Sequence, residues 1–336
     1  MDATADFLAL PLAETDNVRI AASLSTSRGL EVALRATPVP GSGFERRVKA
    51  KTPYPVTAGL TAPNTNAVFA TGAWPTLAAL AQSVLDQQAA AQVPGAAAIA
   101  ARLRPLTQTW SGAIFARTLP QADSLALDLG FGLRPGTPPS APIDALGALL
   151  ADPALPTLLQ EVWGKHVPQI ATKRSASGLD VTFAFVSGTP PAAVAYLLTG
   201  TTTLTLAMQV RDGTLFIGSE PGGRPRQEKL AGAAAQPGGT LAAALADANG
   251  REGVLFVELW GLARPVLHAA LSPSQRRFVD MLLSMPGLSN MSLPLSLTFD
   301  GGDAFHADLR APTQTLHNLS ALLNLLGGGI GPSAGP

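Results

Sequence analysis

Residues 300–308 hold the densest grouping of side chains that could do chemistry. Their sequence is D-G-G-D-A-F-H-A-D, which places three carboxylates, Asp300, Asp303 and Asp308, around His306. On a β-strand His306 and Asp308 share a face, because side chains alternate along a strand. With a carboxylate of the turn they could hold a divalent cation through oxygen and imidazole ligands, or the pair could serve a hydrolase.

A simpler interpretation of this segment needs neither a metal nor catalysis. Asp-Gly-Gly-Asp is a common turn composition, and polar residues that alternate along a strand place His306 and Asp308 on its wet face. We therefore expect residues 300–303 to form a hairpin turn, and we expect no metal site there. A hydrolase that uses His306 with Asp308 stays an alternative.

The rest of the sequence contains no recognisable catalytic or cofactor motif. The absence of cysteine excludes disulfides, thiolate zinc sites, iron–sulfur clusters and cysteine nucleophiles. The other histidines, His166, His268 and His317, have no second ligand three or four residues away. No nucleophile elbow, P-loop or complete dinucleotide-binding fingerprint is present. We expect no cofactor and favour a binding protein over an enzyme.

Charge is sparse and balanced in this chain. There are 23 lysines and arginines against 23 aspartates and glutamates, and charged residues make up 14% of the 336 residues. A nucleic-acid surface needs clustered basic side chains, but the densest groupings, residues 46–51 and 224–229, are short and diluted. We interpret them as a solvated strand edge or loop and expect no nucleic-acid partner. Two acidic pairs are likewise interpreted as solvated loop residues: Glu14 with Asp16, and Asp247 with Glu252.

Hydropathy gives no sign of a membrane span or a leader. No run reaches the roughly 18 uninterrupted apolar residues of a transmembrane helix. Residues 1–6 lack the basic flank and apolar stretch of a signal peptide. We expect no transmembrane segment.

Apolar periodicity predicts alternating strands and helices. The clearest case is a hairpin at residues 18–24 and 30–36, in which one face of each strand is expected to be buried and the other wet. The further predicted strands are residues 66–71, 113–119, 124–133, 178–186, 201–219 with a turn at 211–213, 254–259, 293–299 and 304–310. Helices are predicted to begin near Pro75, Ala96, Pro142, Pro190, Leu262, Ser274 and Pro312.

The two halves of the chain can be laid over each other. One shift aligns Val68 with Val254 and Trp74 with Trp260, both at a strand-to-helix junction, and a slightly smaller shift aligns Asp128 with Asp308. This pattern predicts an internal duplication. We expect an α+β protein of two related modules, each an antiparallel sheet with a packed helical pair. The modules are placed at residues 1–140 and 141–326, and a flexible tail at residues 327–336.

The closing segment carries a resemblance. Its strand hairpin ends in Leu309-Arg310-Ala311-Pro312 before a leucine-rich helix. With the preceding strand pair and helical pair, this resembles uncharacterised exported or lipoprotein-type domains of high-GC proteobacteria, in which such modules occur in tandem. The likeness covers most of the chain in element order, but only residues 293–326 in motif. It implies a periplasmic or cell-surface setting and supplies no catalytic residues. A cytoplasmic location is the alternative, since residues 1–6 do not look like a signal peptide.

An excess of apolar residues, 46% of the chain, is the positive signal for function. Exposed apolar surface beyond a few hundred Å² is costly for a free monomer, so the surplus must fill a core, line a cavity or form an interface. We expect a non-catalytic cell-envelope protein that binds an apolar, lipid-like ligand or a protein partner in a groove between helices and sheet. A structural scaffold or homo-oligomer subunit is the alternative. The candidate groove residues, for which core packing is the competing role, are Phe69, Trp74, Phe256 and Trp260.

Overall fold

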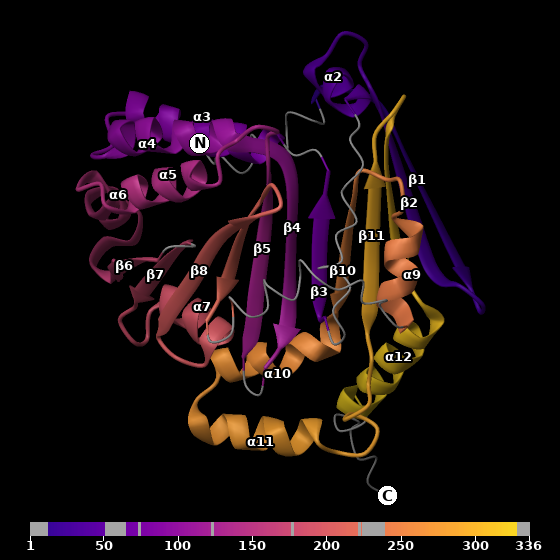
Figure 1. Cartoon of the computed structure of the whole chain (residues 1–336). Coiled ribbons are helices and arrows are strands. Elements are labelled where there is room, and N and C mark those ends of the chain that lie inside the picture. Colours follow the sequence, from indigo (N-terminus) through magenta and orange to yellow (C-terminus); the bar gives the residue numbers. More distant parts are fainter. Residues whose placement is uncertain are drawn as a thin grey trace, which may run out of the picture.

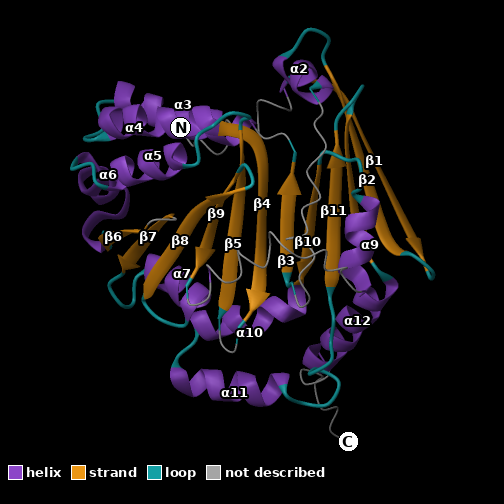
Figure 2. Cartoon of the chain, viewed as in Figure 1, coloured by secondary structure: helices purple, strands orange, loops and turns teal. Residues whose placement is uncertain are grey.

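A single antiparallel sheet organises the molecule. The computed structural model describes residues 13–50, 65–72, 75–121, 124–175, 178–220, 223 and 239–327. Within them twelve strands follow the order β1-β2-β12-β11-β10-β3-β4-β5-β9-β8-β7-β6. Ten α-helices surround this sheet (Figures 1 and 2). The predicted α+β class is confirmed.

Most element bounds agree with the periodicity of the sequence. The strands are β1 (Thr15–Ser25), β2 (Gly29–Pro38), β3 (Ala67–Thr71), β4 (Trp110–Pro120), β5 (Leu125–Leu133), β6 (Gln169–Ser175), β7 (Gly178–Ala184), β8 (Thr203–Arg211), β9 (Thr214–Ser219), β10 (Gly253–Glu258), β11 (Pro294–Asp300) and β12 (Phe305–Ala311). The helices are α2 (Gly43–Lys49), α3 (Pro75–Ala90), α4 (Ala96–Thr109), α5 (Ser140–Leu150), α6 (Ala154–Trp163), α7 (Pro190–Thr199), α9 (Gly239–Asp247), α10 (Leu259–Ala270), α11 (Pro273–Leu283) and α12 (Thr313–Gly327). The sequence did not predict α2, β6 or α9.

The sheet runs without a break across the predicted module boundary. Its central strands are β3 and β10, and each leads into a helical pair, α3–α4 or α10–α11. The N-terminal hairpin β1–β2 pairs with β12, whereas β9 of the second half pairs with β5 of the first. Counted outward from the centre, the strands of the two sides correspond one to one. The order β10, β11, β12, β2, β1 on one side matches β3, β4, β5, β9, β8 on the other. The strands β7 and β6 extend the second side.

The strand register defines two faces of the sheet, because directly paired residues of antiparallel strands point to the same side. One face, which we call the α9 face, carries Val68 and its direct partner Phe256. These pack with Val254 and with Leu245 of α9 in a fully buried cluster. The opposite face, which we call the groove face, carries Phe69 and its partner Leu255.

On the side of the sheet from β5 to β7, the groove face is covered by α5. Ile143 of α5 joins a buried cluster with Leu179, Val181, Met208 and Leu215 of the sheet. Helix α5 in turn contacts α4, which packs on α3 and α6 (Figure 1). This half of the groove face therefore has a conventional two-layer core.

On the side from β3 to β1, the same face is largely open. Ile20 and Leu24 of β1 are 69% and 72% exposed, and every residue of β1 after Thr15 is exposed. The expectation of a buried apolar face on this first hairpin is therefore wrong for β1. The helix α12 follows β12 as α5 follows β5. It is held by Thr315 Oγ1, which donates to the Pro294 carbonyl at 2.9 Å, and by Asn318 Nδ2, which donates to the Ser292 carbonyl at 2.7 Å.

The described helices were also compared with the length of a membrane span. None of them alone is long and apolar enough to cross a bilayer. The bent pair α5 and α6 meets the criterion only when the two helices are taken together across a 67° bend.

Candidate functional site: an apolar groove beneath α2

The short helix α2 lies over one end of the open groove face, at the top of the sheet in Figure 1. Its first turn is capped by Ser42, whose Oγ accepts from the Glu45 N–H at 3.0 Å. A second acceptor comes from the start of the chain, where Glu14 Oε2 takes the Phe44 N–H at 2.6 Å. The sequence suggested that Glu14 is a solvated loop residue. In the structure its carboxylate instead holds the first turn of α2.

The last turn of α2 is anchored to the turn between β11 and β12. The Gly302 N–H donates to the Val48 carbonyl at 2.9 Å, and Val48 is only 3% exposed. A Cβ at Gly301 would come within 2.4 Å of that carbonyl oxygen, so this contact requires glycine. The Asp-Gly-Gly-Asp segment is therefore a hairpin turn, as expected. It also contacts the last turn of α2 and holds that helix in place; we call this contact the seat of α2.

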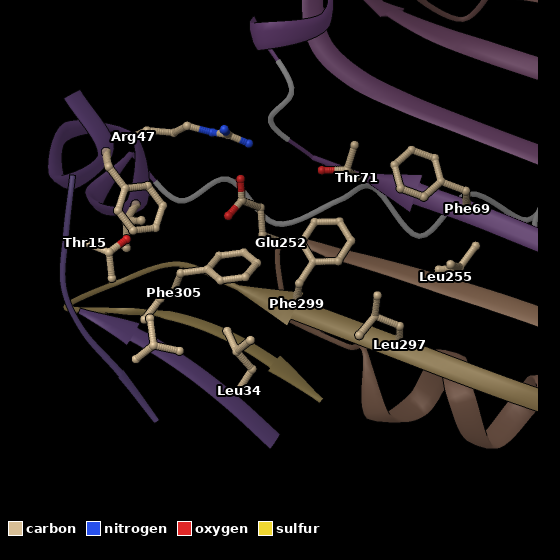
Figure 3. Close-up of a pocket in the computed structure, with 14 residues that line it drawn as sticks. Thr15, Leu34, Arg47, Phe69, Thr71, Glu252, Leu255, Leu297, Phe299 and Phe305 are labelled. Atoms are coloured by element: carbon tan, nitrogen blue, oxygen red, sulfur yellow. The ribbon is translucent and has the colours of Figure 1, made fainter. Parts of the chain in front are cut away.

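Between α2 and the sheet is a pocket with a volume of about 420 Å³. Its size falls within the ~300–1,000 Å³ range that is usual for small-molecule sites. Figure 3 shows the aromatic rings and leucines of its wall turned toward one another from strands far apart in sequence. The lining residues are Thr15, Val18, Leu34, Ala36, Phe44, Arg47, Val48, Phe69, Thr71, Glu252, Leu255, Leu297, Phe299 and Phe305.

The floor of this pocket crosses six adjacent strands, from β3 to β1. Five interstrand spacings of about 4.8 Å give it a length of roughly 24 Å. Phe299 and Phe69 form a stacked aromatic pair in this floor, with ring centroids 6.4 Å apart. The Phe299 ring lies over Gly253, where a Cβ would come within 2.1 Å of the ring. The missing side chain at Gly253 therefore sets the position of the aromatic floor.

Polar groups gather along the rim of the pocket nearest α2. Arg47 extends from α2 toward Glu252 and Thr71, which stand at the adjacent ends of β10 and β3 (Figure 3). Glu252 is 8% exposed, so it is buried beside the pocket. The prediction of a solvated loop is therefore wrong for Glu252, and for the basic segment containing Arg47, which forms a helix. The site is an apolar trough with charged groups along one rim.

Ionic contacts on α2 stabilise the helix itself. Lys49 Nζ donates to Glu45 Oε1 at 2.7 Å, one helical turn away. This contact, together with the Gly41 N–H, lowers the pKa of Glu45 below its ordinary value, and the same carboxylate raises the pKa of Lys49. The S-x-x-E signal of Ser42 and Glu45 was the pattern by which the sequence could have revealed α2.

The aromatic residues predicted to line a groove occupy different environments. Phe69 lines the pocket. Its neighbour Phe256 points to the α9 face and is 3% exposed in the core, so it does not contribute to the groove. Trp260 is half-buried at the start of α10, where its Nε1 donates to the Leu288 carbonyl at 2.8 Å. Trp74 lies outside the described residues.

The residues considered for a metal or a hydrolase do not converge on one point. His306 and Asp308 share a face, as the spacing predicted, but that face is the α9 face. His306 is exposed, and Asp308 Oδ2 accepts from Arg251 Nη1 at 2.6 Å. Asp300 is the direct cross-strand partner of His306, while Asp303 is exposed in the turn. Across the described ranges, no group of three or more acidic, histidine or cysteine residues could hold a metal.

Two further ionic groups have clear structural roles. Arg117 and Asp128 form a buried pair on the α9 face, with Nη2 and Oδ2 2.9 Å apart and side chains 3% and 1% exposed. His268 is also buried, and its Nε2 lies 2.8 Å from Asp280 Oδ1. That contact joins α10 to α11. Neither group lines the pocket.

The chain was also compared with protein-family models, with curated proteins and with solved structures. None of the three comparisons finds a significant match. The geometry of the groove is therefore the basis for the functional argument.

Proposed function

We propose that this protein binds a lipid-like apolar ligand in the groove beneath α2, without catalysing a reaction on it. The observation that carries the proposal is the pocket of about 420 Å³, in which nine of the fourteen lining residues are leucine, valine or phenylalanine. An apolar molecule that displaces water from such a surface binds favourably, by about 25 cal/mol for each Å² of apolar surface removed from water.

The dimensions of the groove favour a ligand with one extended chain. A membrane lipid acyl chain spans about half of a ~30 Å hydrocarbon core, roughly 15 Å. The floor across six strands is longer than that, so one chain fits along it. The ligand's polar end would then be placed at the rim with Arg47, since a guanidinium binds a carboxylate or phosphate through paired hydrogen bonds.

The setting of this function follows from the sequence resemblance. We place the protein in the cell envelope, where carriers shield acyl chains from water. The scaffold alternative predicts no ligand at all, and the hydrolase alternative would require His306 and Asp308. Both of these residues lie on the opposite face of the sheet from the pocket.

We also propose that the two halves arose by duplication. The shift that aligns Val68 with Val254 also aligns Phe69 with Leu255. These two residues are direct partners in the sheet, as a local two-fold axis between β3 and β10 requires. The outward strand order on each side supports the same relationship.

The ligand proposal is tested by titration of cis-parinaric acid, a fluorescent fatty acid, with palmitate as competitor. Leu297→Lys places a charge in the pocket floor, and Leu309→Lys is its matched control, because Leu309 is the direct cross-strand neighbour of Leu297 on the same face but outside the lining. We expect saturable binding that Leu297→Lys weakens at least tenfold and Leu309→Lys leaves nearly unchanged. Absence of binding to the unmodified chain, or equal losses in both variants, would contradict the proposal.

A further inference from the structure

We infer that two copies of this chain associate through strand β1, which pairs antiparallel with β1 of the second copy across a two-fold axis at Ala21. The inference concerns the outer edge of the sheet and does not depend on which ligand occupies the groove. Figure 2 shows β1 as the outermost strand on one side of the sheet. Among the described strands, β1 is paired only with β2.

Within the described part of the chain, the edge formed by β1 lacks the usual protection of an exposed strand. Edge strands are normally shortened, bent or supplied with charged residues that prevent pairing with another chain. β1 is eleven residues long, and Val18, Ile20 and Leu24 on its groove face are 46%, 69% and 72% exposed. Arg19 is the only charged residue between positions 17 and 25. The opposite edge, β6, is shorter and carries Lys173 and Arg174.

The corresponding strand in the other half of the sheet does have a further partner. Reading outward from the centre, β8 occupies the place of β1, and the outer side of β8 is paired antiparallel with β7. The shift that relates the central strands places Ala21 of β1 on Ala207 of β8. Ala207 is fully buried, and its direct partner on β7 is Asp180. On the β1 side none of the described strands takes the place of β7, where β1 of the second copy would pair.

The sequence of β1 is complementary to itself in the register centred on Ala21. Centred on Ala21, antiparallel pairing puts Ile20 opposite Ala22 and Val18 opposite Leu24 of the second copy, with all four on the groove face. The other face pairs Arg19 with Ser23. Apolar residues therefore meet apolar residues, and no like charges are opposed.

Two other registers that keep the faces aligned are less favourable. A register centred on Arg19 would place the two arginines directly opposite each other, which is destabilising. A register centred on Ile20 would place Leu24 opposite Asp16. The dimer centred on Ala21 also makes the two groove faces continuous, so the exposed apolar side chains of the two β1 strands become cross-strand neighbours.

The absence of native cysteine makes the register directly measurable. In the proposed dimer the two Ala21 side chains are direct cross-strand neighbours, with Cβ atoms about 5 Å apart. The two Ser23 side chains are offset by four residues, or roughly 13 Å along the strand. We therefore expect Ala21→Cys to form a disulfide-linked dimer on mild oxidation, and Ser23→Cys to remain uncrosslinked.

Light scattering on the unmodified full chain provides the second readout. We expect a mass of twice 34.4 kDa at tens of micromolar protein, and a mass of one chain for the double variant Ile20→Lys, Leu24→Lys. Val194→Lys on α7 is the control, because Val194 is 56% exposed but distant from β1 in chain order and outside the sheet; it should leave the dimer intact. A single-chain mass at all concentrations, or equal crosslinking at positions 21 and 23, would overturn the inference.

Discussion

The two sides of the groove face show how one sheet can serve two purposes. From β5 to β7 the face is covered by α5, and Leu179, Val181 and Leu215 are almost completely buried. From β3 to β1 similar apolar residues are only partly covered, by the short helix α2 at one end. The same strand chemistry makes a core where α5 covers it and a groove where α2 covers only one end. Function is thus expected where the second layer is incomplete.

The largest expected effect is a difference in stability cost between a substitution in the covered core and one on the open side. Leu215→Ala removes a side chain that is 1% exposed and should lower the free energy of unfolding by about 2–5 kcal/mol, because a cavity remains. Leu309→Ala, at a position that is 39% exposed on the open side, should cost less than about 1 kcal/mol. Urea unfolding with an unchanged m-value would measure both. Similar costs at the two positions would show that the open side is packed as tightly as the covered one.

The second prediction concerns the seat of α2. Gly301→Ala introduces a Cβ within 2.4 Å of the Val48 carbonyl, so α2 must shift and the groove must lose its cover. We expect roughly a tenfold loss of affinity for cis-parinaric acid, while the urea midpoint changes far less than in Leu215→Ala.

A matched glycine in the covered half provides the control for this substitution. Gly147 lies within α5, where an added Cβ meets no atom within 4 Å. Gly147→Ala should leave binding unchanged and should slightly stabilise the protein, because alanine favours a helix. Unaltered binding in Gly301→Ala would refute the role of α2.

The third prediction concerns the polar rim, where we expect a smaller effect. Arg47 lines the pocket, whereas its neighbour Arg46 instead donates to the Gly41 carbonyl outside the lining. Arg47→Gln should weaken binding of palmitate several-fold and leave binding of the corresponding fatty alcohol unchanged. Arg46→Gln should change neither, as judged by competition with cis-parinaric acid. Equal losses for acid and alcohol would mean that Arg47 contributes packing and not charge.

The smallest expected effect is the loss of stability when the solution is made acidic. The Lys49 ammonium lowers the pKa of Glu45 on α2. In the covered half, the Ala154 N–H and then Arg102 lower the pKa of Asp152 at the start of α6. A carboxylate with a lowered pKa in the folded state stabilises the protein above its unfolded pKa, and this contribution is lost as the pH falls through the folded pKa.

Both carboxylates should therefore titrate below their ordinary ranges, and their contacts on α2 and at the start of α6 should weaken only in strongly acidic solution. Carbon-detected NMR titration of the side-chain carboxyls measures these midpoints. A midpoint at or above the ordinary value for either residue would contradict the contact assigned to it.

Periodicity predicted the fold elements well where pairing or burial enforces the pattern. The central strands around Val68 and Val254 and the helical pairs that follow them were found from their apolar spacing. The burial of β1 was not predictable, because alternation records which side chains share a face and not whether another layer covers that face. Strand order was equally inaccessible, since pairing of β2 with β12 joins residues from opposite ends of the chain.

The site was only partly predictable for related reasons. Phe69 was predicted to be a groove residue and lines the groove. Val68, next to it in the chain, and Phe256, which was predicted together with it, point to the opposite face of the sheet. The missed contributors, Arg47 and Glu252, come from segments that look like solvated loops when the chain is read alone. What brings them together is the seat of α2 on the glycine turn at Gly301 and Gly302, a contact between distant segments with no periodic signal.

The most direct test of the central claim compares the two halves in a single sample. Leucine methyl groups would be labelled with carbon-13, and palmitate would be added while their NMR signals are followed. The account predicts saturable shifts at Leu34, Leu255 and Leu297 in the groove, with Leu179 and Leu215 in the covered core unchanged. Shifts confined to the covered leucines, or none at any of the five, would contradict it.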